Sequence, residues 1–497
     1  MIVKSAASFR GILIVGFLTA AIVGGGVLAK REAPQEIVAG EKVVPIGSTV
    51  MLCPEPGAGA ELGVRVTAAV VPGQVGQDGP VGSAAIETLL GKKSESAEIT
   101  APGGQAEIAA FGRALPPISV RGVGSLAPGL IADQWSRDPR GQGRGMASTA
   151  CGPAATEFWF VGGGAIAGRQ TRVVLVNPDE NSAIVDIIIH GPDGIIEAPA
   201  GRGLVVKGER RVVVRLDALV PGTKATAVHV VVRTGRIGAT VDDDQMSGLQ
   251  SIGSDWIPSA AMPATTVYVP GVLPGNGPRV LSVVAPGDDD ANVKVRVMSA
   301  AGTFAPADRD LIRVSAGTVA SIDMSLVTEK QPVTLELTSD TPIVAGVRQF
   351  IGGNKAQQDT TYSSGTRPFT GTSAVSGLPV REATTVNLMV TAVTEDAVVD
   401  VTLLPFRAGE VVSTPTKPRR VKIAAGNVQW LAVDPPAGIE WFTAIVTPVE
   451  GSGPVLVAHQ VREVSKYGDL VTGYPWLPLR DTVTVPVAQE DLGLTIR

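Results

Sequence analysis

The sequence predicts an all-β protein of tandem β-sandwich repeats, preceded by one N-terminal transmembrane helix. The 497 residues are 44% hydrophobic but only 4% aromatic, with 59 glycines and 37 prolines. Short runs of Val, Ile, Leu and Ala between Gly and Pro are typical of β-strands. One strand–turn–strand pattern recurs along the chain, and one long uncharged run stands near the N-terminus.

The N-terminal run, residues 11–29, reads GILIVGFLTAAIVGGGVLA. It carries no charged side chain and is long enough for a short membrane-spanning helix. We expect residues 1–10 to remain in the cytoplasm and everything after Lys30 to be exported. Cleavage after Ala29, giving a secreted protein, is the alternative, but the run is longer than the usual apolar core of a signal peptide.

Cys53 and Cys151 are the only two cysteines of the chain. Outside the cytoplasm such a pair predicts a disulfide, with two buried free thiols as the alternative because sequence alone does not fix the pairing. We expect no metal site at the cysteines, because no neighbouring His or Cys completes a tetrahedral shell.

The repeated unit is clearest in RVVLVNPDENSAIVDIIIHGPDG from Arg172. It recurs as RVLSVVAPGDDDANVKVRVMSAAG from Arg279 and as TTVNLMVTAVTEDAVVDVTLLPFRAG from Thr384. Two more strand pairs follow in each copy, and a degenerate copy precedes the three full ones. Units of about 100 residues with about six or seven strands suit sandwiches of two facing sheets.

Three segments lie outside this pattern. Residues 73–107 are rich in Gly, Ser and charge and are expected to form a mobile insertion. Asp255–Pro258 and Pro475–Pro478 each place a tryptophan beside proline, and we expect plugs at the junctions between repeats. Strand Thr482–Val487 resembles the first strand of a repeat that does not follow. We expect it to pair with a neighbouring repeat or a partner, because an exposed strand edge invites aggregation. The expected boundaries are a linker at 30–42, a degenerate repeat at 43–150, full repeats at 151–253, 254–365 and 366–474, and a terminal strand within 475–497.

The Leu-Val-Asn-Pro run, the alternating valines and Pro-Asp-Gly resemble the immunoglobulin-like repeats of secreted bacterial surface proteins. The order of membrane segment, Cys-Pro, then Cys-Gly-Pro before FWFVGGG and RVVLVNP resembles an actinobacterial exported family of unknown function. The resemblance covers residues 45–490. It implies immunoglobulin-like sandwiches and a place in the cell envelope, and it brings no activity.

The chain offers few residues for catalysis. His190, His229 and His459 are the only histidines, and we interpret them as structural residues on strands. The nucleophile-elbow, zinc-protease and dinucleotide motifs are absent from the sequence, so we expect no catalytic residue, cofactor or metal. The acidic triplets Asp242–Asp244 and Asp288–Asp290 lack the ligand spacing of a calcium loop, and solvated turns are the preferred interpretation.

Two functions remain after this test. A net charge of −5 provides no basic face for nucleic acid. We favour a non-catalytic, membrane-anchored scaffold or protein-interaction module of the cell envelope, built as a semi-rigid rod. The alternative is a carbohydrate-binding or accessory subunit for an envelope-polymer enzyme, which would need an exposed aromatic platform. Trp159, Trp430 and Trp441 are candidates for the platform, although we expect them in cores or junctions. The partner would then be an envelope protein or a glycan.

Overall fold

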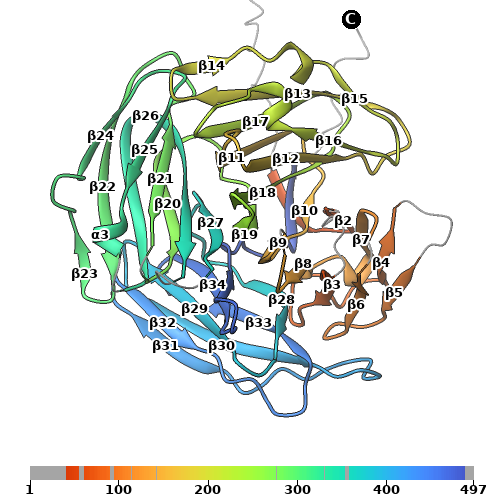
Figure 1. Cartoon of the computed structure of the whole chain (residues 1–497). Helices are drawn as coiled ribbons and strands as arrows, with labels where there is room; N and C mark the ends of the chain where they lie inside the picture. Colours follow the sequence, from red (N-terminus) through yellow and green to blue (C-terminus); the bar gives the residue numbers. More distant parts are fainter. Residues whose placement is uncertain are drawn as a thin grey trace, which may run out of the picture. The chain divides into compact units, whose positions relative to one another are not determined.

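The computed structural model describes residues 41–54, 61–89, 95–112, 115–141, 143–275, 277–328, 331–352 and 357–486. These residues are mostly strand, and their helices are short turns: η1 (Gly124–Leu126), η2 (Pro199–Gly201), α2 (Leu216–Leu219) and α3 (Ser325–Thr328). The predicted all-β class is therefore confirmed (Figure 1). The chain divides into two compact parts, of which the larger spans residues 45–483.

The first repeat of the larger part is built from two antiparallel sheets that share one apolar core. Their strand orders are β10-β2-β7-β4-β5 and β6-β3-β8-β9. The strands are β2 (Ser48–Cys53), β3 (Gly63–Val70), β4 (Ser83–Thr88), β5 (Ser96–Ile99), β6 (Gln105–Phe111), β7 (Ile118–Val123), β8 (Leu130–Asp138), β9 (Gly145–Ala150) and β10 (Gly152–Pro153).

The second repeat has the same two-sheet plan. One sheet has the order β11-β17-β13-β14 with β15 also on β13, and the other has the order β16-β12-β18-β19. The strands are β11 (Glu157–Gly163), β12 (Arg169–Val176), β13 (Ala183–Gly191), β14 (Gly194–Ile196), β15 (Leu204–Val206), β16 (Arg211–Arg215), β17 (Thr226–Thr234), β18 (Gly238–Ser247) and β19 (Gln250–Ile257).

The third repeat differs because one long strand, β26, takes part in both sheets. Its first half pairs with β20 and β22, and its second half pairs with β21 and β27. The strands are β20 (Ala264–Val272), β21 (Arg279–Val284), β22 (Ala291–Ser299), β23 (Gly302–Phe304), β24 (Leu311–Val314), β25 (Val319–Asp323), β26 (Val333–Ile351) and β27 (Asp359–Ser364).

The fourth repeat returns to two separate sheets, with the orders β28-β33-β30-β31 and β32-β29-β34-β35. The strands are β28 (Ser373–Pro379), β29 (Thr384–Ala392), β30 (Ala397–Phe406), β31 (Arg419–Ile423), β32 (Val428–Ala432), β33 (Trp441–Pro448), β34 (Val455–Glu463) and β35 (Leu470–Thr472).

Burial along the strands explains why the sequence patterns differ between them. Strand β22 alternates buried Val293 and Val295 with exposed Lys294 and Arg296, because one face packs on the core and the other meets water. Strand β27 is buried at every position, because neighbouring repeats cover the face turned away from its own core. The long apolar runs of the sequence therefore belong to strands covered on both sides.

Two expected boundaries are wrong. The described residues of segment 73–107 include β4, β5 and the start of β6, which extend both sheets of the first repeat and bury Ile86. A mobile insertion is not what the structure has there. The boundary at 253/254 falls inside β19, which pairs with β18 through residue 257. The segment taken for a junction is therefore the last strand of the second repeat.

The terminal strand of the sequence does find a partner. Strand β36 (Thr482–Pro486) pairs with β1 (Glu41–Pro45) in a two-stranded sheet. Strand pairing therefore joins the described ends of the chain. The predicted terminal strand is paired along one edge, as its expected partner requirement demands.

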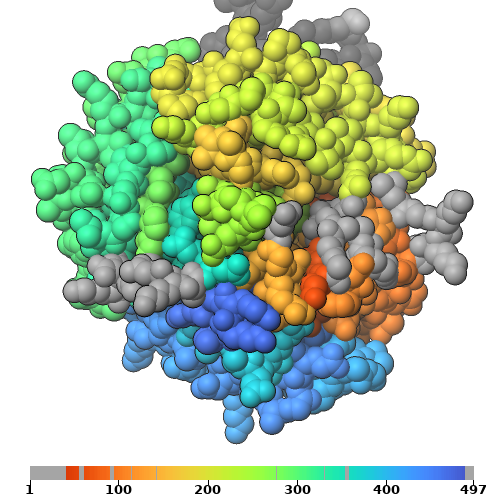
Figure 2. All heavy atoms as spheres, in the orientation of Figure 1, coloured from red at the N-terminus to blue at the C-terminus, as the bar shows by residue number. Residues whose placement is uncertain are grey.

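The four repeats form a closed circuit of contacts within residues 45–483. Figure 2 shows the first repeat, in orange, against the fourth, in blue. Leu404 of the fourth repeat packs in one apolar cluster with Ile131 of the first. Similar clusters join the other neighbours, and they contain Trp256 between the first and second repeats, Trp159 between the second and third, and Met389 between the third and fourth. The expected semi-rigid rod of repeats is therefore wrong.

The predicted membrane segment, residues 11–29, lies outside the described residues. Within the part of the chain that the structure describes, none of the helices has the length and apolar character needed to cross a bilayer.

Candidate binding pocket and buried polar centre

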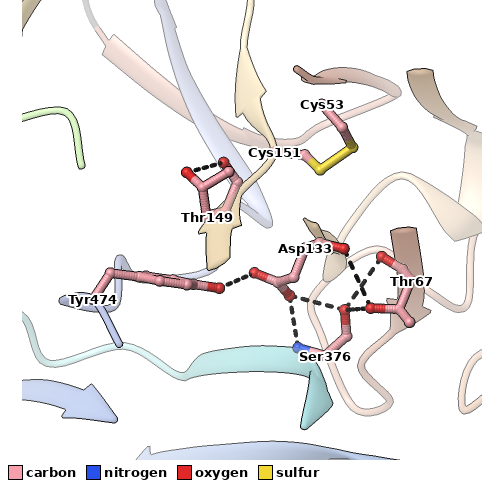
Figure 3. Close-up of a disulfide and its surroundings, with 8 residues drawn as sticks. Cys53, Thr67, Asp133, Thr149, Cys151, Ser376 and Tyr474 are labelled. Atoms are coloured by element: carbon pink, nitrogen blue, oxygen red, sulfur yellow. Dashed lines mark hydrogen bonds between the residues drawn. A yellow bond between two sulfur atoms is a disulfide. The ribbon is translucent and has the colours of Figure 1, made fainter. Parts of the chain in front are cut away.

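Cys53 and Cys151 form a disulfide, as the sequence predicts (Figure 3). Cys53 ends β2 in one sheet of the first repeat, and Cys151 follows β9 in the other sheet. Both residues are buried in the core of that repeat. The bond therefore ties the two sheets together over a sequence separation of 98 residues.

The last strands of the repeats, β9, β19, β27 and β35, lie against one another. Small residues allow the close approach. A Cβ at Gly253 in β19 would lie 2.2 Å from the backbone nitrogen of Thr360 in β27. A Cβ at Gly145 in β9 would lie 2.8 Å from the carbonyl oxygen of Ser254 in β19. The sequence pattern placed the end of β19 at a junction between repeats and gave no sign that these strands meet.

Asp255 in β19 joins all four repeats through one buried carboxyl group. It accepts hydrogen bonds from Ser148 N of the first repeat at 3.1 Å and from Thr361 Oγ1 of the third at 2.8 Å. It also accepts one from Thr472 Oγ1 of the fourth at 3.0 Å and one from Trp256 N at 2.8 Å. Burial raises the pKa of Asp255 well above its usual value.

Asp359, at the start of β27, makes a similar connection. Its carboxyl group accepts hydrogen bonds from Met146 N of the first repeat at 3.2 Å and from Val471 N of the fourth at 2.9 Å. Burial raises its pKa to about 7. The backbone amides of two other repeats therefore depend on this one side chain.

Asp133 in β8 connects the first repeat to the fourth (Figure 3). It accepts hydrogen bonds from Ser376 N at 2.6 Å and from Ser376 Oγ at 2.8 Å, and Tyr474 also donates to it. Burial raises its pKa to about 6, against the lowering effect of these donors. Because internal groups occupy these carboxyl oxygens, we interpret the polar centre as structural.

The first acidic triplet is not a turn. Asp242–Asp244 lies on β18, where the carboxylate of Asp243 accepts a hydrogen bond from Arg169 at 2.9 Å and another from Tyr362 of the third repeat. Although burial alone would raise it, the pKa of Asp243 is lowered because Arg169 and Arg348 lie beside it. The second triplet, at 288–290, does lie in the turn between β21 and β22. Among the described residues no group of His, Cys, Asp and Glu is arranged to hold a metal ion.

Two histidines that are distant in sequence meet at one tryptophan. His229 stacks on the Trp159 ring with centroids 3.9 Å apart, and His190 lies 5.4 Å from the same ring. His229 Nε2 hydrogen bonds to Glu157 at 2.9 Å, and His190 Nδ1 donates to the carbonyl of Gly317 at 2.9 Å. Burial lowers the pKa of both histidines. The group lies at the interface between the second and third repeats.

The third histidine and the remaining tryptophans are also internal. Trp476 Nε1 donates to His459 Nδ1 at 2.8 Å, and burial lowers the pKa of His459 to about 3. Trp159 and Trp441 are buried, and Trp430 is half-buried. The proposed tryptophan platform is therefore not formed by these three residues, whereas Trp256 and Trp476 are buried as the predicted plugs require.

A pocket of about 500 Å³ lies between the first and fourth repeats. Strands β3, β6 and β8 line one side, and β28, β29 and β34 line the other. Its acidic and basic side chains are partly paired, with Arg137 Nε donating to Glu463 at 2.7 Å across the two repeats. Glu107 accepts a hydrogen bond from Trp441 Nε1 at 2.8 Å.

Two buried polar atoms of this pocket lack partners. Arg65 donates to the carbonyl of Gly377 at 2.9 Å and lies over the Trp441 ring, but its Nε finds no hydrogen-bond partner among the described residues. Thr384 Oγ1 is also buried without a hydrogen-bond partner among the described residues. Burial lowers the pKa of Arg65 to about 10.

The rim of the pocket carries Phe111, whose side chain is exposed over 71% of its surface. Trp135 lies buried in the wall. Sequence reasoning missed this site because its two sides are far apart in the chain: Arg137 and Glu463 are separated by 326 residues. Phe111 lies shortly after the segment that was assigned to an insertion, and no sequence pattern around it indicated a binding site.

The comparisons with known proteins identify the family. A profile described as a family of unknown function, DUF5719, matches residues 109–434, which is more than half of the chain. The chain belongs to the DUF5719 family. The DUF5719 match starts in β6 and ends after β32, so it contains the second and third repeats whole and the others in part. No curated protein and no solved structure matches the chain.

Proposed function

We propose that this DUF5719 protein is a membrane-anchored, extracytoplasmic and non-catalytic interaction module of the cell envelope. The observation that carries the proposal is the buried disulfide between Cys53 and Cys151. Disulfides form and persist in oxidising compartments and are rare in the cytosol. Residues 11–29 supply the anchor in this proposal, and the two-sheet repeats act as immunoglobulin-like surface domains.

The closed circuit of repeats suits such a module. Loops held by a rigid framework are common recognition surfaces. The turn at 287–292, which runs into the start of β22, is exposed except at Ala291, and we assign it to partner contact. A partner protein or glycan of the envelope is then held at a fixed position relative to the membrane.

The topology is tested by labelling intact cells with a membrane-impermeant maleimide. Asp289→Cys introduces an exposed thiol in the third repeat, and both native cysteines are occupied by the disulfide. We expect this variant to be labelled and the matched Ser5→Cys variant to be protected until the cells are lysed. Protection of the cysteine at 289 contradicts export. Crosslinking followed by affinity purification then identifies the envelope partner, and a swap of turn 287–292 should reduce its recovery.

A second candidate is a carbohydrate-binding accessory subunit for an envelope-polymer enzyme. The specific observation in its favour is the pocket between the first and fourth repeats, with exposed Phe111 at its rim. Exposed aromatic rings beside convergent polar groups are typical of binding sites for small ligands.

A further inference from the structure

We propose that the pocket between the first and fourth repeats binds an uncharged sugar residue of a glycan. This inference rests on the second candidate function and specifies its ligand. The volume of about 500 Å³ lies within the range of sites that enclose small molecules. It is therefore suited to a part of a glycan chain rather than to a folded partner.

The unpartnered atoms define the first requirement on the ligand. Arg65 Nε is a donor that needs an acceptor, and Thr384 Oγ1 both donates and accepts. Leaving such groups buried without partners is unfavourable. A sugar hydroxyl meets both needs, because it donates one hydrogen bond and accepts others.

The balance of charge defines the second requirement. Arg381 repels the Arg65 guanidinium electrostatically, whereas Glu107 and Glu440 stabilise it. All four residues line the pocket. A ligand anion would meet the glutamates of the lining, and a ligand cation would meet its three arginines, Arg65, Arg137 and Arg381. An uncharged polyhydroxyl ligand avoids both penalties, because its hydroxyl groups accept from arginine and donate to carboxylate.

Phe111 supplies the third element of recognition. Its ring is exposed over 71% of its surface at the mouth of the pocket. An aromatic face offers apolar area and a negative quadrupole to the C–H face of a sugar ring. The polar wall and this ring together select a ligand with one apolar face and hydroxyls at its edge.

The test uses the purified full-length chain on an array of immobilised neutral, uronate-bearing and amine-bearing oligosaccharides of matched length. We expect binding to neutral sugars in preference to both charged classes. Phe111→Ala should weaken it about tenfold, the size expected for loss of one aromatic contact. Arg381→Gln should also weaken it. Phe304→Ala and Arg367→Gln are the matched controls, because they alter exposed Phe and Arg side chains of the third repeat and its end, away from the pocket.

The outcomes separate this proposal from the others. Thermal unfolding of each variant is the control for folding, and Phe111→Ala and Arg381→Gln should melt close to the wild type. Preference for charged oligosaccharides, no binding to any sugar, or equal loss in the control variants overturns the assignment of the pocket. Surface labelling at residue 289 in cells is independent of sugar binding, so failure on the array leaves the export proposal standing.

Discussion

Asp255 illustrates how a single side chain can couple distant parts of the chain. One of its carboxyl oxygens accepts from two backbone amides, and the other lies beside the hydroxyls of Thr361 and Thr472. Hydroxyls accept as well as donate, so a protonated carboxyl group fits this position. The raised pKa is consistent with that neutral form.

We therefore expect two substitutions of Asp255 to differ in their effect on the free energy of unfolding. Asp255→Asn resembles the neutral acid and should change the free energy of unfolding at pH 5 by about 1 kcal/mol or less. Asp255→Ala removes all the hydrogen bonds of this carboxyl group, including those from two buried backbone amides, and should cost about 3 kcal/mol or more. Urea denaturation compares the two directly. Equal destabilisation by both variants contradicts the role of the hydrogen bonds.

The same residue gives a pH dependence with a defined sign. A carboxyl group whose pKa is raised on folding favours the folded state at low pH, and this contribution is lost as the pH rises above the usual value of 3.8. The stability advantage of Asp255→Asn over the wild type should therefore grow from pH 4 to pH 8. Asp133 and Asp359 are present in both proteins, so the difference between the two curves reports Asp255 together with its electrostatic coupling to Asp359. A difference that stays constant with pH contradicts the raised pKa.

The disulfide predicts a larger loss of stability. Opening a loop of about 100 residues destabilises a protein by about 4.7 kcal/mol in the chain-entropy model. The double variant Cys53→Ala, Cys151→Ala should lose about that free energy of unfolding, measured with urea. The wild type with a reductant should approach the value of the variant. If reductant leaves the midpoint of the wild type unchanged, the bond is not formed in solution.

At the level of elements, the central strands depend on glycine. Gly253 has φ +122° and faces the backbone of Thr360, so an alanine adds both conformational strain and a clash. Gly248 in the same hairpin has φ +62° with nothing within 4 Å of its missing Cβ. Gly253→Ala should destabilise the protein by about 3 kcal/mol or more. Gly248→Ala is the matched control for strain alone, with a cost of about 1–2 kcal/mol. Equal melting temperatures for the two variants contradict close packing of β19 on β27.

The strands that were predicted correctly could be recognised from patterns of residues close together in the sequence. The stretch from Arg172 to Gly194 contains most of β12 and all of β13, separated by the polar turn that the pattern predicts. Apolar runs and turn residues are properties of neighbouring positions. The identity of β19 as a paired strand was missed, because both of its faces are covered and the Trp-Ile-Pro segment resembles a linker.

The pocket shows what such patterns do not contain. Its walls come from β3 and β8 at one end of the chain and from β29 and β34 at the other. Their meeting depends on how the four repeats pack, and one sequence without relatives gives no sign of contacts over such separations. The meeting of His190 and His229 at Trp159 was missed for the same reason. The disulfide was predicted because its two cysteines had no alternative partners in the chain.

At the level of the whole molecule, the closed circuit predicts cooperative unfolding. In a linear array each repeat contacts only its neighbours, and terminal repeats can unfold separately. Here each repeat packs on two others through apolar clusters, and Asp255 joins all four. Calorimetry of the full-length chain should show one transition for residues 45–483, with a van't Hoff enthalpy close to the calorimetric one.

Opening the circuit at one interface should remove this cooperativity. Leu404 is fully buried in the cluster between the fourth and first repeats, and Leu404→Ala should cost about 2–5 kcal/mol. Because that loss falls on the interface that closes the circuit, we expect the first repeat to unfold in a separate transition at lower temperature. Wild-type protein that already shows two resolved transitions contradicts the closed circuit. A single broadened transition in the variant contradicts the assignment of Leu404 as a main contact of this interface.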